Sequence, residues 1–327
     1  MNLNKMVTIS VFILSALGVA FSAQARITIT IAHTHVETHP EHKAFLAFKN
    51  HIENKLEDKY EIQIYPNGLS GSNERAFELV KINSIQFMAV SSSNIENLAK
   101  NYAIFSIPYL FNSEEVFEKF ICDPEVLTEL GKNSDKDGFI PLAAFTAGTR
   151  NFYAKFPIYS VDDLKDKVIR IQTGRTNSLM MEAFGANDYI MKFSDVYQAL
   201  KHDVIDGAEN NELVLVDQKH GEFCKYYSYD GHQMIPDFLI GSRDFLKSLS
   251  DEDYAVFKEA AMEAQRVEFR EWKYRINAAK EQAKTMGVNF INVDVKSFRE
   301  KVLPLHEELL EKNPEIRELY EMAKKYH

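Results

Sequence analysis

The sequence has few of the residues that mark several special classes of protein. Among 327 residues it has two cysteines, one tryptophan, 13 glycines and 9 prolines, and 45% of its residues are hydrophobic. This composition excludes collagen-like, low-complexity and disordered classes. Basic residues are also in deficit, with 38 Lys and Arg against 48 Asp and Glu and a net charge of −10. Because nucleic acid is bound by clustered basic residues, it is excluded as the main partner.

The cysteines and glycines form no catalytic signature. Cys122 and Cys224 have no C-x-x-C or metal-ligand spacing, and we expect two buried free thiols, although an oxidising compartment would permit a disulfide between them. Gly68 and Gly71 resemble a phosphate loop without its Lys-Ser/Thr ending, so we interpret them as a turn. No nucleophile elbow, dinucleotide fingerprint or zinc-protease signature is present. We therefore expect no cofactor, and an exported hydrolase or lyase stays the enzymatic alternative.

The N-terminus has the pattern of an export signal. Lys5 is the single charged residue before Arg26, and between them an apolar run occupies 6–21. It leads to Ala23-Gln24-Ala25, the small-x-small pattern of a signal-peptidase site. The run is shorter than the roughly 20 residues that span a bilayer, which disfavours a membrane anchor. We predict a signal peptide at 1–25, cleavage after Ala25 and export to the periplasm.

Strand-like and helix-like segments alternate along the rest of the chain. Period-two alternation and short apolar runs predict strands, and an apolar face at helical spacing predicts helices. The predicted strands are 27–32, 60–66, 87–90, 167–172 and 204–210, and the predicted helices are 40–56, 73–83, 177–184 and 195–202, the last capped by Ser194. This rhythm predicts an α/β protein with mostly parallel sheets and helices on both faces.

One helical pattern is unusually long. It runs without glycine or proline from 251 to 286, and Ser250 and Asp253 form a predicted capping box at its start. It would span about 54 Å, more than the roughly 30–40 Å of one lobe. At roughly 100–200 residues per domain the chain has two domains. We predict that this helix is a strut joining two lobes across a cleft.

Four histidines within ten residues provide an alternative function. His33, His35, His39 and His42 carry imidazole, which suits zinc or copper, so a periplasmic metal-capture protein is a second hypothesis. In the sequence no acidic or cysteine ligand completes a tight set. We favour the interpretation as a loop and the start of a helix.

Two arginines have the chemistry to bind an anion. Arg150 ends a Gly-Thr-Arg turn, and Arg170 lies among apolar residues of a predicted strand. The pattern alone fits an exposed edge strand. If the sheet is instead covered on both faces, the Arg170 guanidinium needs an anionic partner, and the neighbours on its strand face, Val168 and Gln172, supply none. A ligand carboxylate would satisfy it through two parallel hydrogen bonds.

Several segments together resemble one family. The chain is similar to the substrate-binding subunits of tripartite ATP-independent periplasmic (TRAP) transporters, the DctP family, over nearly its whole mature length. The segments that carry the resemblance are Tyr65-Pro66-Asn67-Gly68, Asn73-Glu74-Arg75, Gly148-Thr149-Arg150, Asp163-Leu164-Lys165, Val168-Ile169-Arg170-Ile171, Phe193-Ser194-Asp195-Val196-Tyr197-Gln198-Ala199-Leu200 and Ile205-Asp206-Gly207-Ala208-Glu209-Asn210.

The resemblance implies an architecture and partners. It implies a two-lobed α/β periplasmic binding protein whose lobes are joined by crossing strands and a long helix. We expect 26–147 with about 236–275 in lobe I, and 148–235 with about 276–327 in lobe II. It further implies a non-enzymatic monomer that delivers a small organic acid to membrane permease subunits driven by an ion gradient. A sensor role would use the same binding chemistry.

The resemblance also implies binding residues. Arg170 corresponds to the arginine that forms a salt bridge with the ligand carboxylate, Arg150 to a second arginine near it, and Asn210 to a polar clamp. The other implied contacts are Phe193, Glu74, Thr34 and Ser92. Asn211 stands where many relatives have proline, and with His232 and Asp237 it is similar to the branch that binds sugar acids such as hexuronates. A C4-dicarboxylate or a sialic acid remains the alternative ligand.

Overall fold

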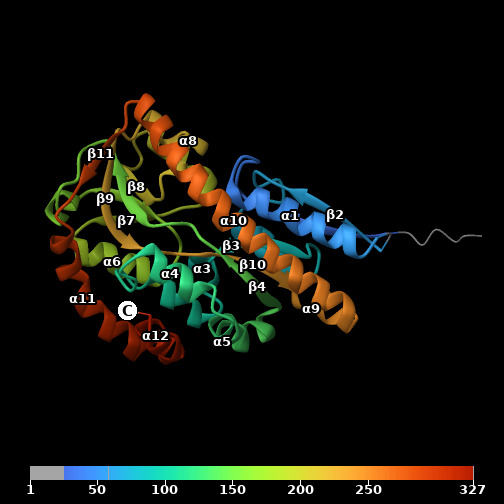
Figure 1. Cartoon of the computed structure of the whole chain (residues 1–327). Helices are drawn as coiled ribbons and strands as arrows, with labels where there is room; N and C mark the ends of the chain where they lie inside the picture. Colours follow the sequence, from blue (N-terminus) through green and yellow to red (C-terminus); the bar gives the residue numbers. More distant parts are fainter. Residues whose placement is uncertain (1–25, 58, 327) are drawn as a thin grey trace, which may run out of the picture.

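In the computed structural model, which describes residues 26–57 and 59–326, the chain folds into two lobes, each built on one β-sheet (Figure 1). The predicted signal peptide lies outside the described residues. The first sheet has the order β2-β1-β3-β10-β4 and the second the order β11-β9-β5-β8-β6-β7. The strands are β1 (Ile27–Ala32), β2 (Tyr60–Tyr65), β3 (Phe87–Ser91), β4 (Phe139–Phe145), β5 (Arg150–Ala154), β6 (Val168–Ile171), β7 (Asn187–Ile190), β8 (Gly207–Asn210), β9 (Tyr226–Gln233), β10 (Asp237–Ser242) and β11 (Asn289–Asn292).

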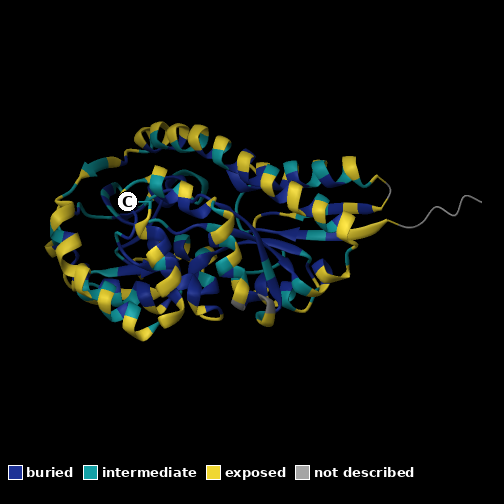
Figure 2. Ribbon diagram, turned by 60° about the horizontal axis from the view of Figure 1, so that its bottom comes forward, coloured by how far each residue is buried: buried dark blue, intermediate teal, exposed yellow. Residues whose placement is uncertain are grey.

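Helices cover these sheets. Figure 2 shows buried strands beneath helices whose outer faces are exposed. The edge strand β7 is an exception, since all of its residues are exposed. The helices are α1 (Pro40–Lys55), α2 (Asn73–Lys81), α3 (Ser92–Ile95), α4 (Glu114–Ile121), α5 (Pro124–Ser134), α6 (Arg175–Phe184), α7 (Val196–Lys201), α8 (Leu213–Asp217), α9 (Arg243–Ser248), α10 (Asp251–Thr285), α11 (Val295–Lys312) and α12 (Arg317–Lys324). Short 3-10 helices are η1 (Lys100–Ser106), η2 (Asp135–Asp137), η3 (Val161–Leu164), η4 (Phe193–Asp195), η5 (His220–Glu222) and η6 (Pro314–Ile316). None of the described helices is both long and apolar enough to cross a membrane.

Both sheets are mixed, and in each the reversed strand is one that crosses between the lobes. The chain passes from β4 in the first sheet to β5 in the second, and later returns from β9 to β10. A strand that arrives from the other lobe begins at the end of the sheet that faces that lobe. For this reason β10 runs antiparallel to β3 and β4, and β5 runs antiparallel to β8 and β9. The prediction of mostly parallel sheets therefore needs this refinement.

The strut predicted from the sequence is α10, which runs beside both lobes (Figure 1). Its first half packs Ala260, Ala261 and Ala264 into the core of the first lobe against α1, and its second half packs Ala279 and Ala283 in the second lobe. The small alanine side chains let α10 approach both lobes closely, so a single helix packs against the two lobes.

The start of α10 is fastened to the first sheet. Ser250 caps the helix by accepting the N–H of Asp253 at 3.1 Å. The Asp253 carboxylate does not close a capping box but accepts the Tyr60 hydroxyl at 2.6 Å and pairs with Lys59. A reciprocal capping box does form at Ser160 and Asp163, where it opens η3.

Three local predictions differ from the structure. Ser194 does not cap α7, because the chain is already helical at Asp195 and no side chain caps the helix. Cys224 is a buried free thiol as expected, whereas Cys122 is free but exposed. The C-terminal residues that we expected in the second lobe divide, because Phe298 and Val302 pack in its core while Leu309, Ile316, Leu319, Met322 and Ala323 pack in the first lobe.

Candidate functional site

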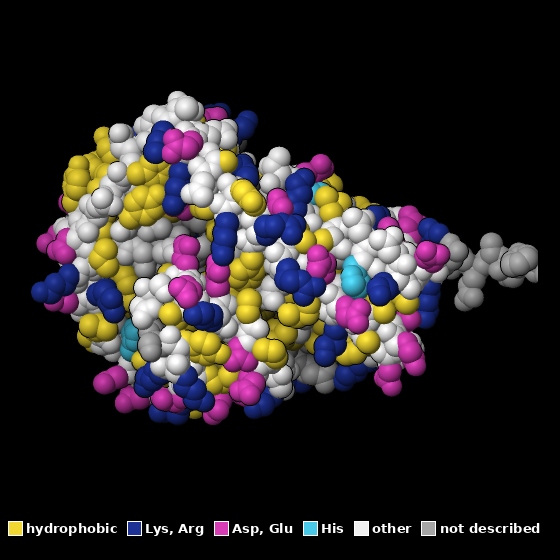
Figure 3. All heavy atoms as spheres, in the orientation of Figure 1, with side chains coloured by type: hydrophobic (Ala, Val, Ile, Leu, Met, Phe, Trp, Pro, Cys, Tyr) yellow, Lys and Arg dark blue, Asp and Glu magenta, His cyan; other side chains and the backbone are white. Residues whose placement is uncertain are grey.

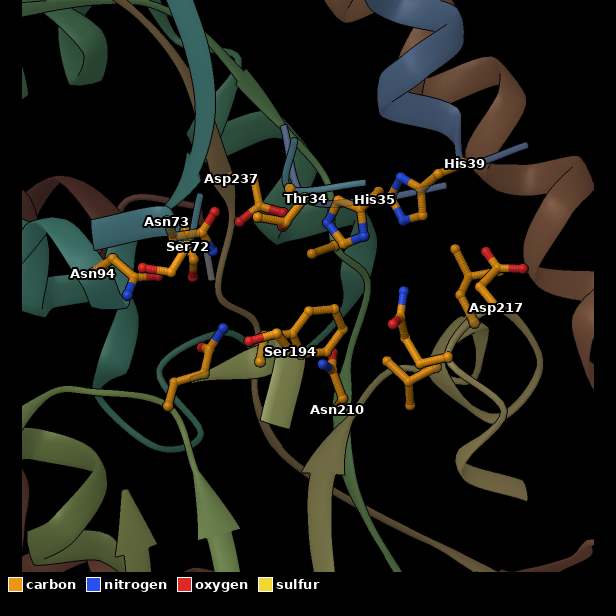
Figure 4. A pocket seen from close by; sticks show the side chains of 18 of the residues that line it. Thr34, His35, His39, Ser72, Asn73, Asn94, Ser194, Asn210, Asp217 and Asp237 are labelled. Carbon is orange, nitrogen blue, oxygen red and sulfur yellow. The ribbon is translucent and has the colours of Figure 1, made fainter. Parts of the chain in front are cut away.

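A cavity of about 490 Å³ lies between the two lobes. Its volume is in the range of small-molecule sites. The cavity lies at the C-terminal ends of the parallel strands, which are β1, β2 and β3 in the first sheet and β6, β7 and β8 in the second. Sheets of α/β proteins commonly bind ligands at these strand ends. Figure 4 shows His35, His39, Thr34 and Asp237 on one side, facing Ser194 and Asn210 on the other.

Arg170 lies on β6 in the wall formed by the second lobe. Because β7 pairs on the outer side of β6, the residue is in the sheet interior and only 3% exposed, so the edge-strand interpretation is wrong. Its Nε and Nη2 donate to the Met191 carbonyl at 3.3 and 3.0 Å. The centroid of the Phe193 ring lies 5.9 Å from the guanidinium carbon. No carboxylate among the described residues pairs with it. Among the described residues, Arg170 is therefore a buried cation with the Met191 carbonyl as its hydrogen-bond acceptor and Phe193 as an aromatic neighbour. The Glu209 and Glu74 carboxylates act on its charge without forming an ion pair with it.

Arg150 also lines the cavity, but it is paired within the protein. Its Nε binds the Glu209 carboxylate, its Nη2 donates to the Glu209 carbonyl at 2.9 Å and its Nη1 donates to Asn210 Oδ1 at 3.2 Å. His232 is fully buried behind this pair, with its Nδ1 2.7 Å from Asp230 Oδ2 and its Nε2 3.6 Å from the Glu209 carboxylate. Arg150, Glu209, His232 and Asp230 thus form one chain of alternating basic and acidic side chains.

The charges in this network stabilise one another, which appears in the pKa values of Glu209 and His232. Burial alone would raise the pKa of Glu209, but Arg150 and His232 lower it to about 2. Burial alone would lower the pKa of His232, but the Asp230 and Glu209 carboxylates raise it to about 9. His232 is thus a cation at neutral pH, and it lies outside the cavity lining rather than on a surface loop.

The wall formed by the first lobe carries imidazoles and carboxyl groups. The His35 and His39 rings stack with centroids 3.8 Å apart and planes 8° from parallel. His39 also caps α1, since its Nδ1 accepts the N–H of Glu41 at 3.3 Å. His33 and His42 form a separate buried pair, with Nε2 and Nδ1 3.0 Å apart.

Glu41 corrects the expectation that no acidic residue completes a set with the histidines. Possible ligand atoms of His35, His39 and Glu41 lie within 4.8 Å of one another. In stacked, nearly parallel rings, however, the nitrogen lone pairs do not converge on one point, and the His39 Nδ1 is used by the cap. The arrangement therefore suits hydrogen bonding to a ligand better than shared coordination of a metal ion.

Burial disfavours the charged forms of His35, His39 and Glu41. It lowers the pKa of His35 and lowers that of His39 well below the ordinary value, so both rings are neutral at pH 7. Burial and the neighbouring Asp237 carboxylate raise the pKa of Glu41 well above its ordinary range. This wall consequently offers neutral donors and acceptors together with the Asp237 carboxylate.

The structure brings most of the predicted contacts to the cavity. Arg170, Arg150, Asn210, Asn211, Phe193, Glu74, Thr34 and Asp237 all line it. Ser92 does not, because it is buried behind the lining while Ser91 takes that place. Asn211 donates to the Ala147 carbonyl at 3.1 Å, and Glu74 accepts Asn94 Nδ2 at 3.1 Å.

Sequence reasoning missed Glu209 as the partner of Arg150. The available signal was an acidic residue inside a strand expected to be covered on both faces, where a charge needs a partner. It also missed Trp272 on α10 and Asp217, which is paired with Arg275 and lines the cavity.

Two lobes with a cavity between them, lined by a buried guanidinium that pairs with no carboxylate of the described residues, are the arrangement of a two-lobed solute-binding protein. Over residues 31–313 the sequence matches bacterial extracellular solute-binding protein family 7, DctP. The chain belongs to this family and is a periplasmic solute-binding protein of the TRAP type, not an enzyme.

Relatives resemble it over most of their length. An uncharacterized protein of Salmonella typhimurium, YiiZ, is 34% identical over 83% of each chain. The crystal structure of a TRAP solute-binding protein of Anaerococcus prevotii with bound α/β-D-glucuronate is 40% identical, with a TM-score of 0.91 over 92% of this chain and 98% of that one. A Sulfitobacter structure with bound β-D-galacturonate is 27% identical, with a TM-score of 0.86 over 91% and 100% of the two chains.

Proposed function

We propose that this protein captures a hexuronate, such as D-glucuronate or D-galacturonate, and delivers it to the permease subunits of a TRAP transporter. The observation that carries the proposal is Arg170, a buried guanidinium that forms no ion pair with a carboxylate in the part of the chain that the structure describes. A buried charge is costly unless it is paired, and a ligand carboxylate supplies the missing partner. The glucuronate and galacturonate bound by the similar structures support this class of ligand.

The charges of the cavity favour a ligand with one carboxylate and several hydroxyl groups. Besides Arg170 the lining has the carboxylates of Asp237 and Glu74, which accept hydrogen bonds and repel a second anionic group. The neutral His35 and His39 rings add further hydrogen-bonding positions. A hexuronate matches this pattern, whereas a C4-dicarboxylate would place its second carboxylate near acidic side chains.

Capture proceeds by closure of the lobes. The ligand carboxylate binds Arg170 and Asn210 on the second lobe, with the Phe193 ring beside it and the Arg150 network holding Asn210 in place. Thr34, His35 and Asp237 of the first lobe then bind the hydroxyl groups. A ligand shifts the equilibrium toward the closed form only by its higher affinity for that form, and contacts made by both lobes provide this difference.

The remaining parts of the proposal concern the setting of the protein. It is exported by the signal peptide at 1–25, cleaved after Ala25, and acts as a monomer. Acidic and basic side chains are mixed over the face shown in Figure 3, where no basic patch appears, in keeping with a small-molecule ligand. Presentation of the closed form to a receptor would use the same cavity.

A screen of ligands tests the assignment. We expect D-glucuronate and D-galacturonate at about 100 times Kd to stabilise the protein by about 2.7 kcal/mol, which thermal unfolding detects. Succinate and N-acetylneuraminate serve as the dicarboxylate and sialic-acid comparisons and are expected to have much smaller effects. Stabilisation by succinate alone, without a hexuronate effect, would show that the ligand class is wrong.

A further inference from the structure

A buried polar contact joins the first lobe to α6 of the second lobe. Glu96, which follows α3, is 6% exposed, and its carboxylate accepts the Ser106 hydroxyl at 2.6 Å. The same carboxylate faces the backbone N–H groups of Arg175 and Thr176 in the first turn of α6. Glu96 and Ser106 belong to the first lobe and α6 belongs to the second, so the contact crosses the boundary between the lobes.

Helix α6 has no cap of its own. Its N-cap residue is Gly174, which has no side chain to accept the first N–H groups. A Cβ on Gly174 would lie 2.4 Å from Glu96 Oε1, so only glycine permits the carboxylate to come this close. The free N–H groups and the positive end of a helix both favour a carboxylate at this position. Glu96 therefore does for α6, from the other lobe, what an N-cap side chain ordinarily does.

Amide and hydroxyl side chains extend the contact to the strand that crosses between the lobes. Gln233 at the end of β9 donates to Asn177 Oδ1 at 3.0 Å and to the Ser106 carbonyl at 2.5 Å, and Asn177 Nδ2 donates to Ser93 Oγ at 3.4 Å. Glu96 is the ionisable side chain within this network. The charged side chain on the same turn of α6, Arg175, is exposed.

The contact also supports one edge of the ligand cavity. The loop from β6 to α6 carries Gln172 and Thr173 into the lining, directly after the strand of Arg170. Thr173 Oγ1 accepts Asn94 Nδ2 at 3.0 Å, which is a second link to the first lobe. Gln172 Oε1 is buried and has no hydrogen-bond donor among the described residues. A buried acceptor that faces a cavity without a donor is suited to a hydroxyl group of the ligand.

We propose that Glu96 is a positioning residue for ligand capture, which caps α6 across the lobe boundary and thereby holds Gln172 where its oxygen accepts a ligand hydroxyl. The identity of the ligand rests on the proposed function, but the capping role does not. Glu96 touches no ligand and acts through the loop between β6 and α6.

The role predicts a pH dependence with a defined sign. Burial raises the pKa of Glu96 from 4.5 to about 7, although Ser106 and the α6 N–H groups act in the opposite direction. A carboxyl group that loses this contact on opening returns toward its ordinary pKa, so forming the contact takes up a proton and is favoured at low pH. Between pH 6 and pH 8 the affinity then falls by up to about tenfold. The ligand carboxylate is ionised throughout this range.

Calorimetry with D-glucuronate at pH 6 and pH 8 tests the proposal. Loss of a cap corresponds to roughly a 2- to 30-fold change, so we expect Glu96→Ala to weaken binding by that factor. Glu96→Gln keeps an acceptor oxygen and is expected to bind equally well at both pH values. Glu182→Gln, an exposed glutamate on the same helix, is the matched control and should behave as wild type. Wild-type affinity in Glu96→Ala, or a pH dependence that persists in Glu96→Gln, would overturn the proposal.

A second measurement separates this role from the identity of the ligand. If the wild type does not bind D-glucuronate, the ligand assignment is wrong, and hydrogen exchange without ligand then tests the cap. Glu96→Ala should speed exchange of the amides at the start of α6, whereas Glu182→Gln should not. Unchanged exchange in Glu96→Ala would overturn the capping role.

Discussion

Arg150 and Arg170 lie in the same sheet and the same cavity wall, yet they have opposite surroundings. They are 2% and 3% exposed. Arg150 is held by the Glu209 carboxylate and a carbonyl, within a network that includes His232 and Asp230. Within 26–57 and 59–326, Arg170 donates hydrogen bonds only to the carbonyl of Met191. Two equally buried arginines therefore differ in their partners, since Arg150 is paired with a carboxylate and Arg170 is the one that we propose binds the ligand.

The comparison separates stability from binding. Removing one member of a buried ion pair leaves the other charge uncompensated, so its cost appears in folding. Removing a buried cation that has no carboxylate partner leaves no such charge, so its cost appears when the anion binds. The two arginines can accordingly be distinguished by measuring unfolding and affinity in the same variants.

The largest expected effect is on stability at Arg150. Arg150→Ala leaves Glu209 buried without its cation and should lower the free energy of unfolding by about 3–5 kcal/mol. Urea unfolding measures this, with Arg170→Ala as the matched control, for which we expect a change within about 1 kcal/mol because no buried partner is left unpaired. Equal losses in the two variants would contradict the distinction.

The next effect is on affinity at Arg170. Arg170→Ala should weaken hexuronate binding by roughly 2–5 kcal/mol, which is about 30- to several-thousand-fold. Arg170→Lys keeps the charge but loses the paired geometry of the guanidinium, and we expect an intermediate affinity. Titration calorimetry that found wild-type affinity in Arg170→Ala would refute the assignment of the carboxylate site.

The smallest effect is the pH dependence of stability, which should follow the network and not Arg170. The pKa of His232 is raised from 6.5 to about 9, so its contribution is complete below pH 6.5 and is lost as the pH rises through 9. At 1.36 kcal/mol for each pKa unit this amounts to about 3 kcal/mol. Glu209, with its pKa lowered to about 2, contributes above pH 4.5 and loses this contribution as the pH falls through 2.

Urea unfolding at pH 6.5 and pH 9.5 measures the alkaline loss. His232→Gln should remove most of the difference between the two values. A wild-type stability that stays constant over this interval would show that His232 is not a charged member of the network.

Much of the architecture was predictable because it is encoded locally. The strands of 27–32 and 60–65, the helix from 73 and the strut from 251 follow from periodicity, and the strut also from its cap Ser250. The reversed strands were not predictable, because strand direction depends on which lobe each strand comes from. The division of the C-terminal helices between the lobes likewise depends on packing between residues distant in the chain.

The site was predictable in its chemistry but not in its pairings. An arginine flanked by apolar residues pointed to an anion, and the resemblance identified Arg170, Arg150 and Asn210, which the fold brings to one cavity. Ser92 and His232, which the resemblance named, lie outside the cavity lining, because Ser92 is buried behind Ser91 and His232 is buried behind the pair of Arg150 and Glu209. The cap that Glu96 supplies to α6 joins residues about 80 positions apart, so no local sequence pattern predicts it.

By itself the sequence determined the order of strands and helices, the strut and the absence of catalytic motifs, because these depend on neighbouring residues and their periodicity. Only the tertiary structure decided which buried arginine is paired with a carboxylate, in which acids burial raises the pKa and which lobe caps α6. Each of these depends on the low-dielectric surroundings and on partners brought together from distant parts of the chain. The net charge of −10 is a property of the sequence, whereas the burial of Arg170 without a carboxylate paired to it among the described residues is a property of the tertiary structure.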